Sequence, residues 1–154
     1  MAYTSFQTKD YFATKLYTGT GSELTVSGVG FQPNMTWLKN RSATQHHQLY
    51  DSARGAGKVI YPNLTNAEGT VTQNLKSFTS DGYVLGTDGS VNTNNQNFAS
   101  WNWKAGTSTG LSFAAGDITP SYYSVNTTSG IGIYKYTGPG TVGGDTIAHN
   151  LGAT

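Results

Sequence analysis

Apolar and polar residues alternate with a period of two along most of the chain, which is the pattern of half-buried β-strands. The alternation is clearest in three segments, 24–27, 99–104 and 131–134. Shorter strands are predicted at 35–40, 47–50, 58–61 and 83–86. Helical periodicity is absent from these segments, so the pattern predicts an all-β chain.

Turn signals separate the predicted strands at short intervals. Asp81-Gly82 and Asp88-Gly89 are hairpin signals, because both residues of such a pair tolerate positive φ. One short helical turn is expected at 66–68, and the Asn-rich segment 91–97 is expected to be a loop. Many short strands joined by tight turns predict an antiparallel β-sandwich or jelly roll.

Composition narrows the class of protein. Thr, Ser, Asn and Gly make up nearly half of the chain, only 11% of residues are charged, and the net charge is +1. Without Cys there is no disulfide and no thiolate metal site. No cluster of Lys and Arg predicts nucleic-acid binding, and no apolar run predicts a membrane span. The first residues do not form a secretory signal, so we expect release by lysis, as part of a virus.

The chain partly repeats itself. Segment 16–21 returns as 135–140, each with Tyr-Thr-Gly followed by a second glycine. Either a tandem module begins again, or the motif recurs by chance in a chain rich in Gly and Thr. We therefore divide the chain into an N-terminal arm at 1–14, a β-sandwich module at 15–133, and a segment at 134–154. That segment is the start of a second repeat or the closing strand of the first.

Several short strings are similar to a family of tandem-repeat, virion-associated proteins of marine bacteriophages. They lie at 17–21, 30–33, 37–42, 51–55, 77–83 and 101–105. The resemblance implies a jelly roll of the concanavalin or laminin-G kind, and a place on the virion as tail fibre or capsid decoration. It implies no catalytic residues. Asn102 stands where relatives often have Cys.

The acidic and histidine residues do not form a recognisable catalytic or metal set. No two of the eight acids pair at strand spacing, as neighbouring catalytic carboxylates on one strand would. His46 and His47 are adjacent, so on a strand they point to opposite faces and do not chelate one metal easily. We predict that the protein is not an enzyme and has no catalytic residues and no metal site.

Two pairs of charged or acidic residues have structural explanations. Asp81 and Asp88 suit a calcium ion, which prefers oxygen ligands, but turn chemistry alone also explains both. We expect no cofactor, with calcium as the alternative. Asp51 and Arg54 bracket a tight turn, and we expect them to form a local ion pair rather than a ligand site.

Aromatic residues are the best candidates for binding. Trp101 and Trp103 share a strand face with Ala99, which predicts that both pack in the core. Trp37, Tyr134 and Tyr136 are the candidates for carbohydrate binding, because flat rings stack on sugars, and Trp101 and Trp103 are the alternative if that pair is not in the core. Tyr134 and Tyr136 share a face that is either such a binding surface or a subunit contact.

The first dozen residues carry four aromatic residues among Thr and Ser. This segment is either an arm that docks on a neighbouring subunit or an ordinary first strand. The candidate interface residues are Tyr3, Phe6, Tyr11 and Phe12.

Three functions remain open at this point. The first is a viral structural protein, a phage fibre or capsid-decoration module that self-associates and docks on other virion proteins. The second is an adhesin that recognises host surface glycan, and the third is a subunit of a non-viral extracellular filament. The first two predict a place on the virion surface, and all three predict an extracellular one, without nucleic acid or membrane as partner.

Overall fold

The computed structural model describes residues 7–140 and 144–152, and almost all of its regular structure is β-strand. The helices and strands up to residue 103 are η1 (Thr8–Asp10), β1 (Phe12–Thr18), β2 (Leu24–Val26), β3 (Met35–Asn40), β4 (Gln48–Asp51), β5 (Lys58–Val59), β6 (Gly69–Thr70), β7 (Leu75–Thr79), β8 (Gly82–Leu85), α1 (Gly89–Asn92) and β9 (Asn97–Trp103), of which β5 and β6 form a separate hairpin. They are followed by β10 (Tyr122–Asn126) and β11 (Ile131–Lys135).

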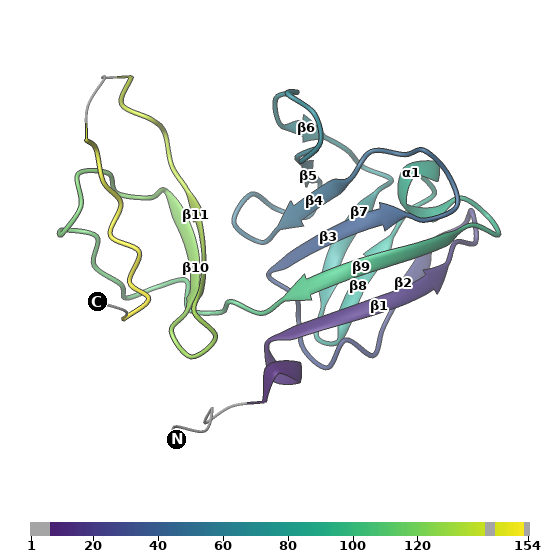
Figure 1. Cartoon of the computed structure of the whole chain (residues 1–154), viewed down its shortest axis with the longest axis horizontal. Coiled ribbons are helices and arrows are strands. Elements are labelled where there is room, and N and C mark those ends of the chain that lie inside the picture. Colours follow the sequence, from purple (N-terminus) through teal and green to yellow (C-terminus); the bar gives the residue numbers. More distant parts are fainter. Residues whose placement is uncertain (1–6, 141–143, 153–154) are drawn as a thin grey trace.

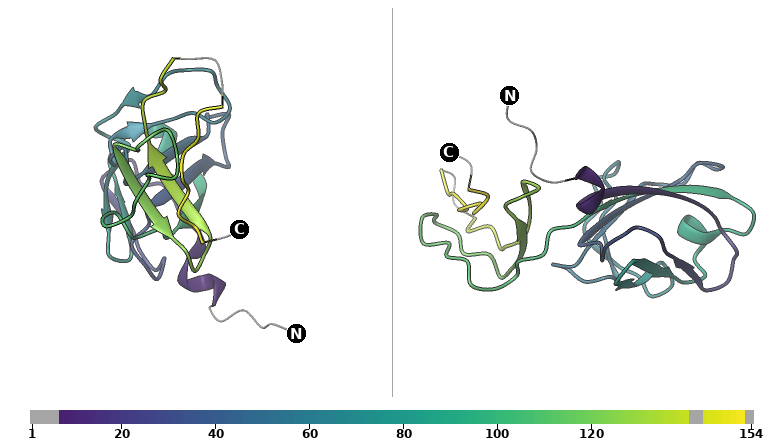
Figure 2. Two further views of the ribbon diagram at one scale, coloured as in Figure 1. Left: turned by 90° about the vertical axis from the view of Figure 1, so that its left-hand side faces the viewer. Right: turned by 90° about the horizontal axis from the view of Figure 1, so that it is seen from below.

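Two antiparallel sheets face each other. The larger has the strand order β1-β9-β3-β4 and the smaller has the order β2-β8-β7. Figure 1 shows the larger sheet in front of the smaller one, and Figure 2 shows the two layers from below. The predicted all-β, antiparallel β-sandwich is confirmed. The finer jelly-roll, concanavalin-like assignment stays a prediction.

The hydrophobic core lies between the two sheets. Leu38 and Tyr50 reach it from the larger sheet, and Leu75, Tyr83 and Leu85 reach it from the smaller one. All five side chains are almost completely buried. Burial of this apolar area is the main force that holds the layers together, at roughly 25 cal/mol per Å².

The inner face of the larger sheet also carries buried polar side chains. The Thr36 hydroxyl donates to Asn102 Oδ1 at 3.0 Å, and Asn102 Nδ2 donates to Ser100 Oγ at 3.0 Å and to the carbonyl of Ala13 at 3.2 Å. Thr36, Ser100 and Asn102 are fully buried. A buried polar group without a partner costs about 1 to 3 kcal/mol, so these bonds make the polar row tolerable inside the sandwich.

The predicted hairpin at Asp81-Gly82 joins β7 to β8. The Asp81 carboxylate accepts hydrogen bonds from the backbone N–H groups of Gly30 at 2.6 Å and Gly28 at 2.8 Å. These bonds, above all that from Gly30, lower the pKa of Asp81. Gly82 has φ +155°, and a Cβ there would lie 1.9 Å from the Val26 carbonyl oxygen, so no larger residue fits. The turn therefore ties the smaller sheet to the loop after β2.

The short helix forms at a different place from the one predicted. Residues 66–68 are not helical, and α1 lies at the start of the segment that was predicted to be a loop. Asp88 begins no hairpin, because its carboxylate accepts from Ser90 N at 2.8 Å and caps α1. Buried Asn92 at the end of α1 then donates to the carbonyl of Gly86 and accepts from Thr20 N. The helix thus closes one end of the sandwich.

Residues 105–140 and 144–152 form a smaller unit beside the sandwich, built on the β10–β11 hairpin (Figure 1). The segment after β11 folds back along residues 112–118: Asp117 N and Ile118 N donate to the carbonyl of Thr146, and Asn150 Nδ2 donates to that of Ser112. The strands of the sandwich itself lie between Phe12 and Trp103. Whether 134–154 also begins a second repeat stays a prediction.

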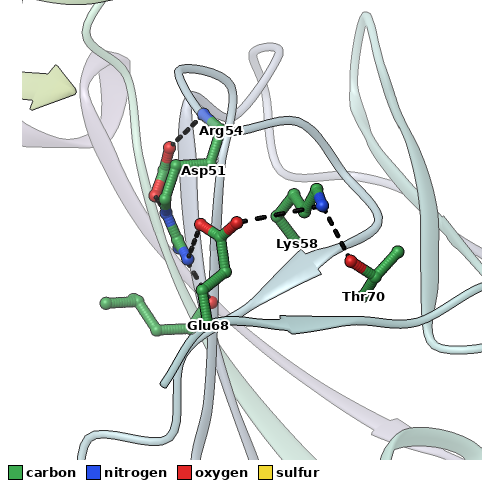
Figure 3. Close-up of polar contacts among 6 residues, drawn as sticks. Asp51, Arg54, Lys58, Glu68 and Thr70 are labelled. Atoms are coloured by element: carbon green, nitrogen blue, oxygen red, sulfur yellow. Dashed lines mark hydrogen bonds and ion pairs between the residues drawn. The ribbon is translucent and has the colours of Figure 1, made fainter. Parts of the chain in front are cut away.

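The predicted ion pair between Asp51 and Arg54 is present at the end of β4. Arg54 Nε lies 2.6 Å from Asp51 Oδ2, and the Arg54 backbone N–H donates to the other carboxylate oxygen at 2.8 Å. Figure 3 shows that Glu68 extends the pair toward Lys58, with its carboxylate 3.5 Å from Arg54 Nη1 and 3.9 Å from Lys58 Nζ. Arg54 Nη2 also donates to the carbonyl of Leu49. The network fixes the connection between β4 and the β5–β6 hairpin.

We expect Arg54→Met to lower the free energy of unfolding by about 3 kcal/mol, because it leaves the buried Asp51 carboxylate without its cation. Urea denaturation measures this loss. Lys76→Met is the matched control: Lys76 pairs with Glu23 at 2.5 Å, but both side chains are more than a third exposed. Such an exposed pair contributes roughly 0.5 kcal/mol or less. Equal losses in the two variants would contradict the structural role of Arg54.

Candidate functional site

The outer face of the larger sheet carries a row of aromatic side chains. Residues of β9 alternate between the two faces, so Ser100 and Asn102 point into the sandwich while Trp101 and Trp103 point outward. The register places Trp101 opposite Trp37 of β3, and Trp103 opposite Phe12 of β1. We call this row, with His47 at its end, the tryptophan surface (Phe12, Trp37, His47, Trp101 and Trp103).

The rings of the tryptophan surface contact one another across three strands. The ring centroids of Phe12 and Trp103 are 5.1 Å apart, those of Trp37 and Trp101 are 6.1 Å apart, and those of Trp37 and His47 are 5.5 Å apart. The last two pairs meet edge to face. Because the rings do not lie flat against each other, they leave a pocket of about 330 Å³ between Trp37, His47, Trp101 and Trp103.

The prediction that Trp101 and Trp103 pack in the core is wrong. Both are half-buried on the outer face, because the inner positions of β9 are taken by Phe98, Ser100 and Asn102. The predicted alternation along β9 is correct, but the prediction placed the more apolar side of the strand toward the core. The hydrogen-bonded row that lets Ser100 and Asn102 be buried depends on Thr36 in another strand, which local sequence does not reveal.

His47 is held in one tautomer by the tryptophan surface. Trp37 Nε1 donates to His47 Nδ1 at 2.9 Å, so the neutral imidazole carries its proton on Nε2. Burial, and then the nearby charge of Lys39, lower the pKa of His47. Lys39 Nζ is itself fixed by the carbonyls of Asn40 and Gln45. The pocket therefore presents indole rings and a neutral histidine.

The four candidate interface residues fall in two places. Tyr3 and Phe6 lie outside the described residues. Tyr11 follows η1, with the Lys104 ammonium 5.8 Å from its ring centroid, and Phe12 begins β1. Tyr11 and Phe12 line a second, smaller pocket of about 200 Å³ together with Trp103 and Ile131. Phe12 therefore belongs to the first strand of the larger sheet and extends the tryptophan surface toward the C-terminal unit.

The remaining carbohydrate candidates lie apart from Trp37, in the C-terminal unit. Tyr134 packs against Phe113, with ring centroids 6.2 Å apart, and its hydroxyl donates to the carbonyl of His149. Burial raises the pKa of Tyr134. Tyr136 follows β11 and is 52% exposed. Of the three predicted carbohydrate residues, Trp37 is the one that lies in the tryptophan surface.

The acidic and histidine side chains are spread over the part of the chain that the structure describes. There, no three His, Cys, Asp or Glu side chains come together to hold a metal ion, and no helix has the length and apolarity to cross a membrane. The carboxylates of the calcium candidates Asp81 and Asp88 accept hydrogen bonds from backbone N–H groups of nearby turns. His46 and His47 bond to different partners, Asn63 and Trp37.

We expect the Trp37 indole N–H resonance to move as His47 titrates, between about pH 8 and pH 5, with a midpoint below the ordinary histidine pKa. The depressed pKa means that this histidine stabilises the fold fully above pH 6.5, and that stability falls as the pH drops toward the folded-state pKa. Proton–nitrogen NMR spectra follow the resonance.

The control variants for this titration are His47→Gln, which removes the titrating group, and His46→Gln, which changes the neighbour. The shift should disappear in His47→Gln and persist in His46→Gln. A midpoint at or above pH 6.5 in the wild type would contradict the burial of His47 against Trp37.

Comparison with known proteins gives a family without a known role. The chain belongs to the DUF7483 family, a domain of unknown function, whose family model matches residues 7–154. No curated protein and no solved structure matches the chain. The matched range includes both the sandwich and the C-terminal unit, so the family is defined over the two together.

Proposed function

We propose that this protein is a non-enzymatic adhesive module that binds carbohydrate at its tryptophan surface. The observation that carries the proposal is the pocket of about 330 Å³ between Trp37, His47, Trp101 and Trp103 on the outer face of the larger sheet. Pockets for small ligands begin at about this size, so it suits a single ring of a larger chain.

The chemistry of the pocket fits a sugar. Indole faces contact the apolar C–H face of a sugar ring, and burying that face removes apolar area from water. The neutral His47 has an Nε2–H group left to donate, because its Nδ1 accepts from Trp37. No carboxylate is among the pocket's lining residues, whereas glycoside hydrolysis generally needs two, which favours binding over cleavage.

The surface is also suited to an extended ligand. Phe12, Trp103, Trp101 and Trp37 follow one another across the paired strands β1, β9 and β3. A site on paired strands is held in place before the ligand arrives, which lowers the cost of ordering on binding. Host surface glycans are chains of rings, and such a chain can contact several of these side chains at once.

We expect Trp37→Ala to weaken glycan binding about tenfold or more, a loss of about 1.4 kcal/mol or more, because a half-buried ring contact is removed. A glycan array of bacterial surface polysaccharides identifies the ligand, and calorimetry measures the change. Tyr136→Ala is the matched control, an exposed aromatic residue outside the tryptophan surface. Thermal unfolding checks that both variants are folded. Unchanged binding in Trp37→Ala, or a wild type that binds no glycan, would refute the proposal.

A second candidate is a virion structural module, a fibre or capsid decoration that self-associates. The similarity of several strings to marine phage virion proteins supports it, and so does the free edge of the larger sheet. β1 is an edge strand, and its outward Leu16 is 68% exposed, an unusual position for a large apolar side chain at a sheet edge. The two functions are compatible, since a fibre can also bind a host glycan.

For this second candidate, we expect the wild type to sediment as an oligomer and Leu16→Lys to sediment as a monomer, because a charge at the strand edge opposes pairing. Sedimentation velocity measures the difference. Leu64→Lys is the control, since Leu64 is 37% exposed in a loop away from this edge. Immunogold labelling of phage particles gives the location. A monomeric wild type together with unlabelled particles would argue against the structural module.

A further inference from the structure

A larger and more polar pocket lies at the end of the sandwich where α1 meets the β5–β6 hairpin. We call it the end pocket; its volume is about 540 Å³. Four separate segments form it, and Figure 1 shows them converging around β4, β6 and α1. The residues that the argument uses are Gln48, Tyr61, Leu64, Asn66, Asn74 and Asp88.

Two almost completely buried amides, Gln48 and Asn74, line the end pocket. Gln48 is 2% exposed and Asn74 is 4% exposed. Asn74 Nδ2 donates to Gln48 Oε1 at 3.0 Å and to Ser90 Oγ at 3.1 Å, and the Tyr50 hydroxyl also donates to Gln48 Oε1. Ser90 in turn bonds to Asp88 Oδ1, both through its backbone N–H and through its hydroxyl. The chain of bonds fixes all these side chains in one orientation.

The hydrogen bonds of this network occupy some of the polar side-chain atoms and leave others available to a ligand. Both hydrogens of Asn74 Nδ2 and both lone pairs of Gln48 Oε1 are occupied. The capacity that remains is the donor nitrogen of Gln48, the carbonyl oxygen of Asn74 and the second carboxylate oxygen of Asp88. An array that alternates donor and acceptor groups matches a pair of neighbouring hydroxyls, each of which can both donate and accept.

The charge of the end pocket selects among ligands that carry hydroxyls. Asp88 is its one carboxylate, and its lining residues include no Lys and no Arg. A phosphate, a sulfate or a uronic acid would meet a negative charge without a compensating cation, which costs affinity. The end pocket therefore disfavours an anionic ligand.

Apolar side chains complete the lining. Tyr61 is half-buried, with the His46 ring edge-on at 6.3 Å between centroids, and Leu64 is 37% exposed. An aromatic ring beside a polar wall fits a ligand that has one apolar face and one polar edge. A pyranose ring has both.

We propose that the end pocket binds one neutral sugar residue through Gln48, Asn74 and Asp88, with Tyr61 beneath its apolar face. This site does not rest on the tryptophan surface. The two sites are neighbours in sequence but use different residues: His46 lines the end pocket, and His47 lines the pocket between the tryptophans. A chain with two such sites holds a branched glycan more tightly than either site does alone.

The test is an NMR titration of the whole chain with methyl glycosides of glucose, galactose and N-acetylglucosamine, and with glucuronic acid as the anionic comparison. We expect shifts at the side-chain amides of Gln48 and Asn74, with a dissociation constant on the order of 1 mM for at least one neutral sugar. Glucuronic acid should bind at least tenfold more weakly.

Asn66→Trp fills the end pocket from an exposed position, so it should abolish these shifts without affecting folding. Thr127→Trp adds the same side chain in the exposed β10–β11 turn and should leave them unchanged. Trp37→Ala should also leave them unchanged, which separates this site from the tryptophan surface. No shift with any neutral sugar, equal binding of glucuronic acid, or binding that survives Asn66→Trp would overturn the proposal.

Discussion

The hydrogen-bonded polar row on the inner face of β9 is the constraint on which the rest of the structure depends. Asn102 bonds to Thr36 across the strand pair and to Ser100 along its own strand, and all three are buried. A slip of one residue in β9 would turn Trp101 and Trp103 inward and expose this row. The inner polar bonds therefore fix the register that places tryptophans on the outside.

The same constraint explains why the two candidate sites differ in kind. The outer face is built on the paired strands β1, β9 and β3, so its groups are the large side chains that alternation leaves there, and they are mostly apolar. The end pocket is built where loops meet β4 and α1, so its groups are amides and hydroxyls that bond to one another. One fold thus offers a stacking surface and a hydrogen-bonding cavity, which are the two halves of carbohydrate recognition.

Local sequence predicted seven of the strands and the Asp81-Gly82 turn, but it missed β1, β6, β7 and β10 and could not assign the faces. The strand at 35–40 and the hairpin at Asp81-Gly82 are where alternation and turn chemistry placed them. The face predicted for Trp101 was wrong, because the sequence of one strand is the same whether its polar side is buried or exposed. The hydrogen bond from Thr36 of β3 is what allows the polar side of β9 to be buried.

The end pocket was not predicted from the sequence, because Gln48, Asn74 and Asp88 are far apart in the chain and each is an ordinary polar residue. The ion pair of Asp51 and Arg54 was found because it is local.

The hydrogen bonds of the carboxylates agree with the proposed binding role. A general acid needs a raised pKa, so that it holds its proton near neutral pH. Here hydrogen bonds to Asp81 from Gly30 and Gly28, and to Asp117 from Thr146, lower the pKa of both side chains. Asp51 is paired with Arg54, and one oxygen of Asp88 is occupied by Ser90. These four acids close turns and join segments, and Asp88 keeps its second carboxylate oxygen for the end pocket.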